Sequence, residues 1–562
     1  MLITTLIIFT FGSVVADNNP IIHTKYGKVQ GEAMETFNKN IFYAFQGIPF
    51  AEPPVGELRF KSPQPPRKWK GILGSQNAYK KCVQFDTNIY NPDETEDCLY
   101  LNVYTPQIPN GHRNISLPVL VYIHGGAFIM GSGHINEIRP HRIMDDDIIM
   151  VSVQYRLGFL GFLSTGDLEC PGNYGFKDQQ FALRWVQENI RYFGGDPTKV
   201  TISGESAGGG SVGLQLLGLN GEGLFRGAIQ SSGSSLATWC LQSDPIGHAY
   251  QMANHIDKKI NKRNTNTSEL MRLFKKTDIR ELKRVSSDIF GKDPYESFFN
   301  TTKGILFTGV IEPDHDGAFL IESAFRKLNS GNFHIVPTLL SINSGEGRGF
   351  LSNPLFLSLL PEFDTASEIY VPVDLHVNDR DVVRKIGSEI RKFYIGDEIF
   401  QNNLGHSMRL IGDAVFVKPT IKQAQLQAKY TDVYFYEFAY SGRLAHPTPV
   451  EYLPGAEAAL HADDLKYIFP DAPENVGKFP EIERTTIDRL VSIWTNFVKY
   501  LNPSPQSSAS LQNITWPKVS PNSVPYLLVN ETLEIKHDLK KPMMDEYARI
   551  YDLYAIPPLD TY

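Results

Sequence analysis

The sequence is poor in cysteine, in long apolar runs and in the short spacings that hold metal ions. Its 562 residues include four cysteines and contain neither a C-x-x-C nor an H-E-x-x-H pattern, so a cysteine or histidine metal site is not expected. Beyond the N-terminal segment, no stretch approaches about 18 uninterrupted apolar residues, the length expected of a membrane-spanning helix. The net charge of −8 and the pI of about 6.0 argue against a surface for nucleic acid or anionic membranes.

The chain also lacks the features that usually separate domains. No Pro/Gly/Ser-rich linker, internal repeat or low-complexity block interrupts it. Its length alone would suggest three or four domains at roughly 150 residues each. Large α/β enzymes, however, often keep one sheet and place extra length in loops and helical insertions. We therefore expect residues 17–562 to form a single domain.

The first 16 residues are predicted to be a signal peptide. Residues 2–11 are almost wholly apolar, and Ser13 to Ala16 supply small residues at the expected cleavage site. The C-terminus is neither an ER-retention tetrapeptide nor a hydrophobic GPI signal, so secretion is expected. Five Asn-x-Ser/Thr sequons agree with this expectation, at Asn114, Asn266, Asn300, Asn513 and Asn530.

Four cysteines are an even number, as an oxidising compartment favours. Cys82 and Cys98 enclose a short polar loop that a disulfide could close. Cys170 and Cys240 would then form a second pair or stay free. The sequence alone permits three pairings.

Apolar, β-branched runs of four to eight residues predict strands that are buried on both faces of a mostly parallel sheet. A helical pattern at 179–190 separates the second run from the third, which favours an α/β fold. A second amphipathic helix is predicted at 487–501. Residues 243–330 are predicted to form a surface insertion that contains helices. The predicted strands are 119–123, 148–153, 200–203, 335–342 and 433–438.

The segment Gly204 to Gly208, with the sequence Gly-Glu-Ser-Ala-Gly, follows the strand at 200–203 and precedes residues 209–217, which can open a helix. So tight a turn admits only small residues two positions before and after the serine. It lifts the hydroxyl above the sheet at a helix N-terminus. The pattern predicts Ser206 as a nucleophile, the alternative being a glycine-rich turn with an idle serine.

A second glycine-rich turn, His-Gly-Gly-Ala-Phe at 124–128, directly follows the strand at 119–123. Small residues leave its backbone N–H groups unobstructed, so it can form an oxyanion hole together with the N–H of Ala207. Each such donor contributes about 2.7–4 kcal/mol when it points at the tetrahedral intermediate. We interpret His124 itself as structural.

A nucleophilic serine needs a histidine base, and the base needs a carboxylate that fixes its tautomer. Glu346 follows the strand at 335–342 between two glycines, at the sheet edge where α/β sites assemble. His461 lies on a loop well beyond the last clear core strand. The chain has fourteen histidines, so position alone leaves other bases open.

The chain resembles the type-B carboxylesterase/cholinesterase family of α/β-hydrolases, and within it the insect carboxylesterases. The resemblance runs from about residue 20 to about residue 540. The motifs that carry it are the turn around Ser206 and the segments Glu-Asp-Cys-Leu-Tyr-Leu-Asn-Val at 96–103, Pro-Gly-Asn at 171–173 with Lys-Asp-Gln at 177–179, and Phe-Gly-Gly-Asp-Pro at 193–197.

This resemblance implies an α/β-hydrolase fold and a Ser-His-Glu triad. Glu346 would be its acid, and His461, in a His-x-x-Asp-Leu pattern, its base. The oxyanion hole would use the N–H groups of Gly126, Ala127 and Ala207. Because Ala127 replaces a glycine that many members carry, a narrower acyl pocket is expected.

The resemblance also implies residues around the triad. Ser232 matches a serine near the histidine, and Glu205 directly precedes the nucleophile. The Cys82–Cys98 disulfide is carried over. Cys170–Cys240 is carried over only as an option, because the second bridge varies within the family.

The expected reaction is acyl transfer from a small-molecule ester through Ser206 to water, without a metal or organic cofactor. Cholinesterases keep a tryptophan between the first two cysteines to bind a quaternary ammonium. Residues 83–97 contain none, so choline esters are not expected substrates. Juvenile hormone esterases typically have Gln where this chain has Glu205.

Other functions stay open at this point. Within the enzyme class, the alternative is a dedicated juvenile hormone or odorant/pheromone esterase. The alternative from another class is a non-catalytic adhesion protein like the neuroligins. The oligomeric state is not predicted.

Overall fold

A computed structural model describes residues 19–557, except 76, 86–90, 110–114, 293–304, 353, 448–450 and 471–477. The predicted signal peptide and the sequons at Asn114 and Asn300 lie outside the described residues. Asn266 and Asn513 are exposed, and Asn530 is half-buried.

The described chain is built around an eleven-stranded mixed sheet. Seven strands in the middle, from β10 through β9, β11, β12, β13 and β14 to β15, pair in parallel, and antiparallel strands complete both edges. The order across the sheet is β16 (Leu533–Lys536), β15 (Tyr526–Val529), β14 (Val433–Phe438), β13 (Thr338–Asn343), β12 (Gly227–Ser231), β11 (Gly195–Glu205), β9 (Leu117–Ile123), β10 (Ile149–Val153), β8 (Tyr100–Thr105), β4 (Ile41–Pro49) and β3 (Glu32–Glu35).

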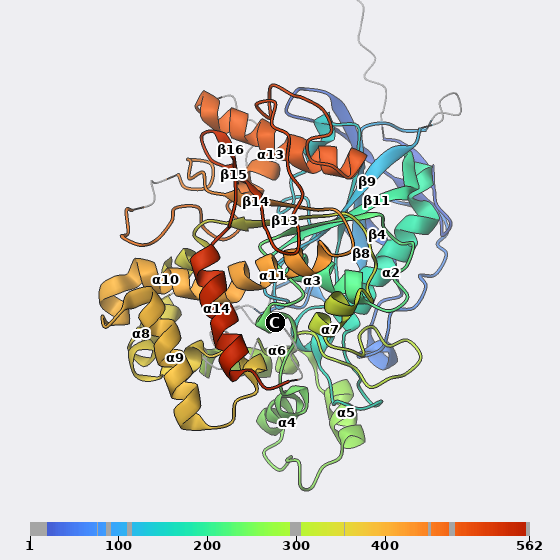
Figure 1. Cartoon of the computed structure of the whole chain (residues 1–562). Helices are drawn as coiled ribbons and strands as arrows, with labels where there is room; N and C mark the ends of the chain where they lie inside the picture. Colours follow the sequence, from blue (N-terminus) through green and yellow to red (C-terminus); the bar gives the residue numbers. More distant parts are fainter. Residues whose placement is uncertain are drawn as a thin grey trace, which may run out of the picture.

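Helices cover both faces of the sheet, and each face has its own buried apolar cluster. Val119 and Val121 of β9 belong to one cluster, with α2 (Tyr174–Asn189), α3 (Ala207–Leu217) and α11 (Lys418–Gln427). Leu120 and Tyr122 belong to the other, with α13 (Glu481–Tyr500). Figure 1 shows α13 above the strands and α3 and α11 below them. This two-faced burial explains the continuous apolar runs and confirms the predicted α/β class.

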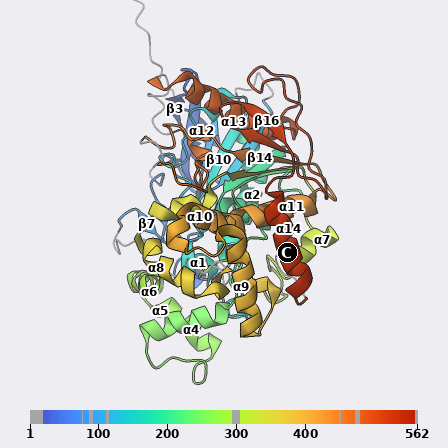
Figure 2. The ribbon, with the colours of Figure 1, turned by 60° about the vertical axis from the view of Figure 1, so that its left-hand side comes forward.

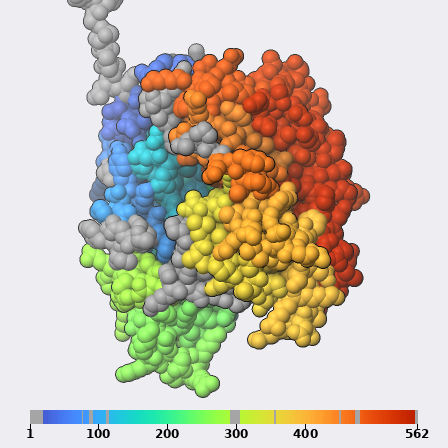
Figure 3. All heavy atoms as spheres, turned by 90° about the vertical axis from the view of Figure 1, so that its left-hand side faces the viewer, coloured from blue at the N-terminus to red at the C-terminus, as the bar shows by residue number. Residues whose placement is uncertain are grey.

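Two groups of additional helices lie beyond the face that α3 covers. The segment predicted as an insertion forms α4 (Pro245–Ile256), α5 (Thr267–Lys276), α6 (Ile279–Lys292) and α7 (Ala324–Ser330). The second group contains α8 (Pro354–Thr365), α9 (Arg380–Ile395), α10 (Leu404–Gly412) and the C-terminal α14 (Lys541–Tyr554). Figure 2 shows α4 and α5 at one end of the molecule, with α9 beside them. In the space-filling view they form the lower end of the surface (Figure 3).

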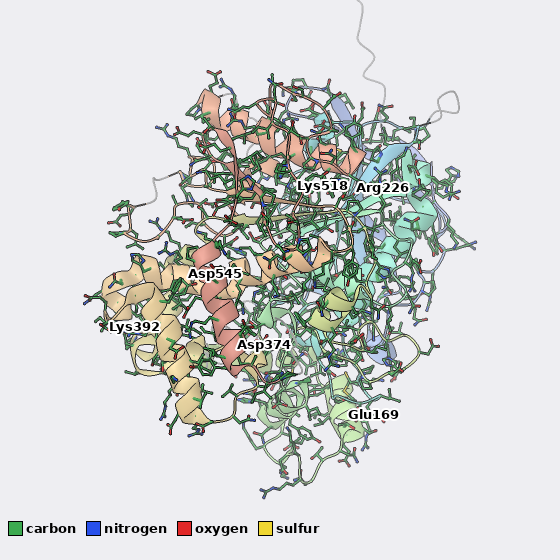
Figure 4. All side chains as sticks on the ribbon, viewed as in Figure 1. Glu169, Arg226, Asp374, Lys392, Lys518 and Asp545 are labelled. Atoms are coloured by element: carbon green, nitrogen blue, oxygen red, sulfur yellow. A yellow bond between two sulfur atoms is a disulfide. The ribbon has the colours of Figure 1, made fainter. Side chains whose placement is uncertain are left out.

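Polar contacts fasten outlying elements to this frame. Arg226, just before β12, donates to the carbonyls of Val498 and Lys499 at the end of α13. The Tyr551 hydroxyl of α14 donates to Asp374 at 2.7 Å. Figure 4 labels Arg226 near the sheet and Asp374 beside α14.

One disulfide is present among the described residues, between Cys82 and Cys98, as predicted. Of the two alternatives for Cys170 and Cys240, the structure contradicts the second bridge, because both residues are buried free thiols. The Cys170 Sγ lies 3.3 Å from the carbonyl of Leu163, whereas the Cys240 Sγ lies 3.1 Å from that of Ser234. Each thiol therefore has its own carbonyl acceptor within the fold.

No helix in the described parts of the chain combines the length and the apolar character needed to cross a membrane.

Candidate active site

Ser206 occupies a strained turn between β11 and α3. Its φ of 57° and ψ of −123° lie where non-glycine residues are rare. Small residues around it are needed, because a Cβ on Gly204 would lie 2.4 Å from the backbone of Gly208. A Cβ on Gly208 would lie 2.1 Å from the carbonyl oxygen of Ile123. The sequence therefore produces the predicted elbow, and its serine precedes the N-terminus of an eleven-residue helix.

The glycine-rich loop after β9 packs against this elbow. A Cβ on Gly125 would lie 2.7 Å from the Glu205 carbonyl oxygen and 3.2 Å from the Cβ of Ser206. Gly126 and Ala127 have φ values of 101° and 54°. The loop's backbone thus runs beside the nucleophile candidate.

His124 stands at the start of the same loop. Its ring stacks on that of Tyr155 with 4.4 Å between centroids, and its Nδ1 contacts the Gly125 carbonyl at 2.8 Å. Burial lowers the pKa of His124 to about 4, so the imidazole is neutral near pH 7. A neutral, stacked histidine agrees with its interpretation as structural.

Glu346 and His461 meet although 115 residues separate them. His461 Nδ1 lies 2.6 Å from Glu346 Oε2. The carboxylate is fully buried, and its other oxygen accepts hydrogen bonds from the Ser232 hydroxyl at 2.5 Å and the Asn343 N–H at 2.7 Å. Both Glu346 oxygens are thus engaged, which fixes the carboxylate and orients the imidazole.

The loop that carries His461 is anchored by its neighbour Asp464. The Asp464 carboxylate accepts hydrogen bonds from Ser231 at 2.7 Å, Tyr436 at 3.0 Å and Asn343 at 3.2 Å. Ser231 and Asn343 are the last residues of β12 and β13, and Tyr436 lies within β14. The histidine loop is therefore fixed to three adjacent strands of the sheet.

Glu205 faces the other side of the imidazole. Its Oε1 lies 3.2 Å from His461 Nε2, and its side chain is 7% exposed. Because Glu205 directly precedes Ser206, this contact places His461 at the elbow. The structure thus brings Ser206, Glu205, Ser232, Glu346 and His461 together, from β11, the turn after β12, the turn after β13 and the late loop.

The charges of Glu205 and His461 depend on each other. Burial raises the pKa of Glu205 to about 8, against the attraction of His461. Burial alone would lower the pKa of His461, but the charges of Glu205 and Glu346 outweigh it and raise the pKa to about 9. When Glu205 is protonated, the largest charge that raises the pKa of His461 is absent, which favours the neutral imidazole.

Two neighbours of His461 carried no predicted role. Asp464 belongs to the His-x-x-Asp-Leu pattern, so the motif itself could have indicated it. Phe416, whose ring packs against His461, lies in a short turn between two helices, and its surrounding sequence gives no signal for this contact.

Known proteins resemble this chain along most of its length. The model of the carboxylesterase family matches residues 18–547. Juvenile hormone esterase of Tribolium castaneum is 32% identical over 524 residues, which cover 89% of this chain and 86% of that protein. Esterase FE4 of Myzus persicae is 33% identical over 520 residues, with coverage of 90% and 88%.

Solved structures agree with these relatives. Juvenile hormone esterase from Manduca sexta, with OTFP covalently attached, matches with a TM-score of 0.81 at 25% identity, covering 95% of this chain and 100% of that one. A PNB esterase matches with a TM-score of 0.73 at 26% identity, covering 94% and 99%. The mixed sheet and its helices are thus an α/β-hydrolase fold. Taken together, family, fold and relatives show that this chain belongs to the carboxylesterase family and is a carboxylic-ester hydrolase.

Proposed function

We propose that the chain hydrolyses esters through an acyl-enzyme on Ser206, with His461 as the base and Glu346 as the acid that orients it. The Ser206 oxygen attacks the ester carbonyl while His461 Nε2 takes its proton. The tetrahedral intermediate then collapses, and the alcohol leaves with the proton from His461. Water attacks the acyl-enzyme with the same assistance and releases the acid.

The observation that carries this proposal is the 2.6 Å contact between Glu346 and His461 beside the Ser206 elbow. Three segments far apart in sequence supply the three residues, in the order serine, acid, histidine that this fold uses. The buried Glu346 carboxylate stabilises the imidazolium that forms during each proton transfer. The N–H groups of Gly126, Ala127 and Ala207 would stabilise the oxyanion of each tetrahedral intermediate.

We further propose that residues 17–562 are the mature, secreted enzyme. Support comes from the apolar segment at 2–11, the sequons and the Cys82–Cys98 disulfide, since disulfides persist in oxidising compartments. Exposed Asn266 and Asn513 are suitable for glycosylation. The proposed substrate class is small carboxylic esters, and choline esters are not expected substrates because residues 83–97 contain no tryptophan.

Replacing Ser206 with Ala tests the mechanism. We expect the variant to fold and its turnover of p-nitrophenyl butyrate to fall by about three to six orders of magnitude. A fluorophosphonate probe should label the wild-type peptide that contains Ser206 and leave the variant unlabelled. Ser510→Ala, at an exposed position, is the matched control and should react normally. Wild-type turnover by Ser206→Ala would refute the mechanism.

A second candidate is hydrolysis of juvenile hormone itself. It is favoured by the likeness to juvenile hormone esterases in sequence and in structure. Glu205 weighs against it, because those enzymes typically carry Gln at this position. Hydrolysis rates for juvenile hormone, odorant-like acetates and simple short-chain esters, measured on one preparation, discriminate the candidates. A kcat/KM for juvenile hormone at least tenfold above the others would assign the hormone.

A further inference from the structure

One face of the His461 imidazole packs against the ring of Phe416. The ring centroids lie 4.3 Å apart, with 32° between the ring planes. Phe416 is 7% exposed. Glu346 contacts Nδ1 and Glu205 faces Nε2, so both carboxylates meet the imidazole at its nitrogens. Phe416 instead contacts the flat surface of the ring, which neither carboxylate occupies.

A π-helical turn, η10 (Asp413–Val417), places Phe416 there, between α10 and α11. Such a turn inserts one extra residue into a helix and is frequent at functional sites. Polar contacts support it on both sides. The Trp239 indole N–H donates to the Val415 carbonyl at 2.9 Å, and the Thr420 hydroxyl donates to the Phe416 carbonyl at 2.7 Å. The position of the Phe416 ring is therefore fixed by the fold.

Phe416 is also the last of three aromatic rings that link the glycine-rich loop to His461. Phe128, at the end of that loop, lies 6.0 Å from Trp239 between centroids, and Trp239 lies 5.9 Å from Phe416. All three rings are buried. Close packing of this kind resists displacement, so the imidazole rests on a rigid support rather than on a mobile side chain.

We propose that Phe416 is a positioning residue for His461, whose ring face fixes the plane of the imidazole and stabilises the imidazolium form. The proposal rests on the proposed function of His461 as the base. An aromatic face attracts a cation, and more strongly where water is excluded. Glu205 from β11, Glu346 from the turn after β13 and Asp464 from the histidine loop are the charged groups that act on His461. A substitution of Phe416 leaves the identity of all three groups unchanged.

Substitutions that remove or keep the ring test the role. Phe416→Leu and Phe416→Met should lower kcat about 3- to 30-fold, the range expected for losing one cation–π contact, with KM within about twofold. Phe416→Tyr should stay within about threefold of wild type. Because the imidazolium forms with every ester, the loss should be equal for p-nitrophenyl acetate, butyrate and octanoate. A loss confined to KM, or to one acyl length, would make Phe416 a pocket wall and overturn the proposal.

A titration separates this role from mere packing. In the Ser206→Ala background, NMR of labelled histidine should show a lower pKa of His461 when Phe416 is Leu, because the imidazolium has lost its aromatic partner. An unchanged pKa overturns the proposal. Phe400→Leu is the matched control, since Phe400 is fully buried and stacks on Phe363. An active Ser206→Ala enzyme would refute the proposed function, whereas an unaffected Phe416→Leu enzyme beside an inactive Ser206→Ala enzyme refutes only this inference.

Discussion

At the scale of single residues, Glu205 has the most direct effect on the proposed base. Its carboxylate lies 3.2 Å from His461 Nε2, the atom that must accept the serine proton. An ionised Glu205 favours imidazolium, which cannot act as a base, whereas a protonated Glu205 leaves the imidazole neutral. Burial raises the pKa of Glu205 to about 8, while the charges of Glu205 and Glu346 raise the pKa of His461 to about 9. We therefore expect the charge of Glu205 to influence the pH at which the enzyme becomes active.

Glu205→Gln tests this dependence. Gln keeps the shape of Glu205 but removes its charge, so the pKa of His461 should fall. The acidic limb of the kcat/KM profile should move to lower pH by about one to two units, because the neutral imidazole persists further into acid. Profiles from pH 4 to 9 on p-nitrophenyl butyrate measure the shift, with Glu281→Gln on the surface of α6 as the control. An unmoved limb would mean that Glu205 carries no charge in the working enzyme.

At the scale of elements, the histidine loop takes its position from the sheet. Asp464 accepts hydrogen bonds from three donors on β12, β13 and β14, and it follows His461 by three residues. Burial raises the pKa of Asp464, while hydrogen bonds from Ser231 and Asn343 oppose that rise. Because the parallel strands are rigid, these hydrogen bonds hold His461 in a fixed position although it lies on a loop.

Asp464→Ala should therefore reduce activity without touching substrate. Three buried donors would lose their acceptor, each at a cost of about 1–3 kcal/mol, and the loop would shift. We expect kcat to fall about 10- to 100-fold, because small misplacements of a catalytic group have effects of this size. The melting temperature should drop as well. Asp397→Ala, at an exposed position, should change neither quantity. Retained kcat in a destabilised Asp464→Ala protein would show that the anchor serves folding alone.

The secondary-structure elements differ in how well the sequence predicts them. The runs at 119–123, 148–153 and 200–203 are buried on both faces, so their apolar character marked β9, β10 and the end of β11. The strand predicted from 335 begins only at Thr338, because Pro337 has no N–H for the ladder and Ile335 is 52% exposed. Helix α2 starts at Tyr174, earlier than its predicted start at 179, because its buried residues between 177 and 180 are polar and break the apolar pattern.

The residues of the candidate site also fall into those that the sequence predicts and those that it does not. Ser206, Glu346 and His461 stand beside glycines or within family motifs, so local sequence indicated them. The contacts of Asp464 and Phe416 depend on how distant strands and helices come together, and no local pattern records that. The free thiols of Cys170 and Cys240 could not be predicted either, because disulfide formation depends on the distance between two cysteines in the fold and not on their number in the sequence.

At the scale of the whole molecule, buried carboxyl groups determine how stability depends on pH. Glu437, near the end of β14, and Asp413, in η10, lie near Lys540, whose Nζ is 3.8 Å from Glu437. Burial raises the pKa of Glu437 to about 7 and that of Asp413 to about 6, against the attraction of Lys540. The pKa of a less buried carboxyl group such as Asp196 shifts in the opposite direction. Burial would raise the pKa of Asp196, but hydrogen bonds from Thr198 and Ser116 lower it well below its ordinary value.

These shifts predict a stability maximum below neutral pH. A carboxyl whose pKa is raised in the folded protein binds a proton there before the unfolded chain does, so its penalty is full above the folded pKa and disappears as pH falls. Melting temperature should therefore rise by about 2–4 °C from pH 8.5 to pH 5.5, and fall again only in stronger acid, where groups such as Asp196 are protonated. Scanning fluorimetry at constant ionic strength measures the profile. Glu437→Gln should flatten it between pH 6 and 8, whereas exposed Glu222→Gln should not. A melting temperature that instead rises from pH 5.5 to 8.5 would contradict the prediction. It would show that Lys540 fully compensates the burial of these carboxyl groups, so that their ionisation does not destabilise the fold.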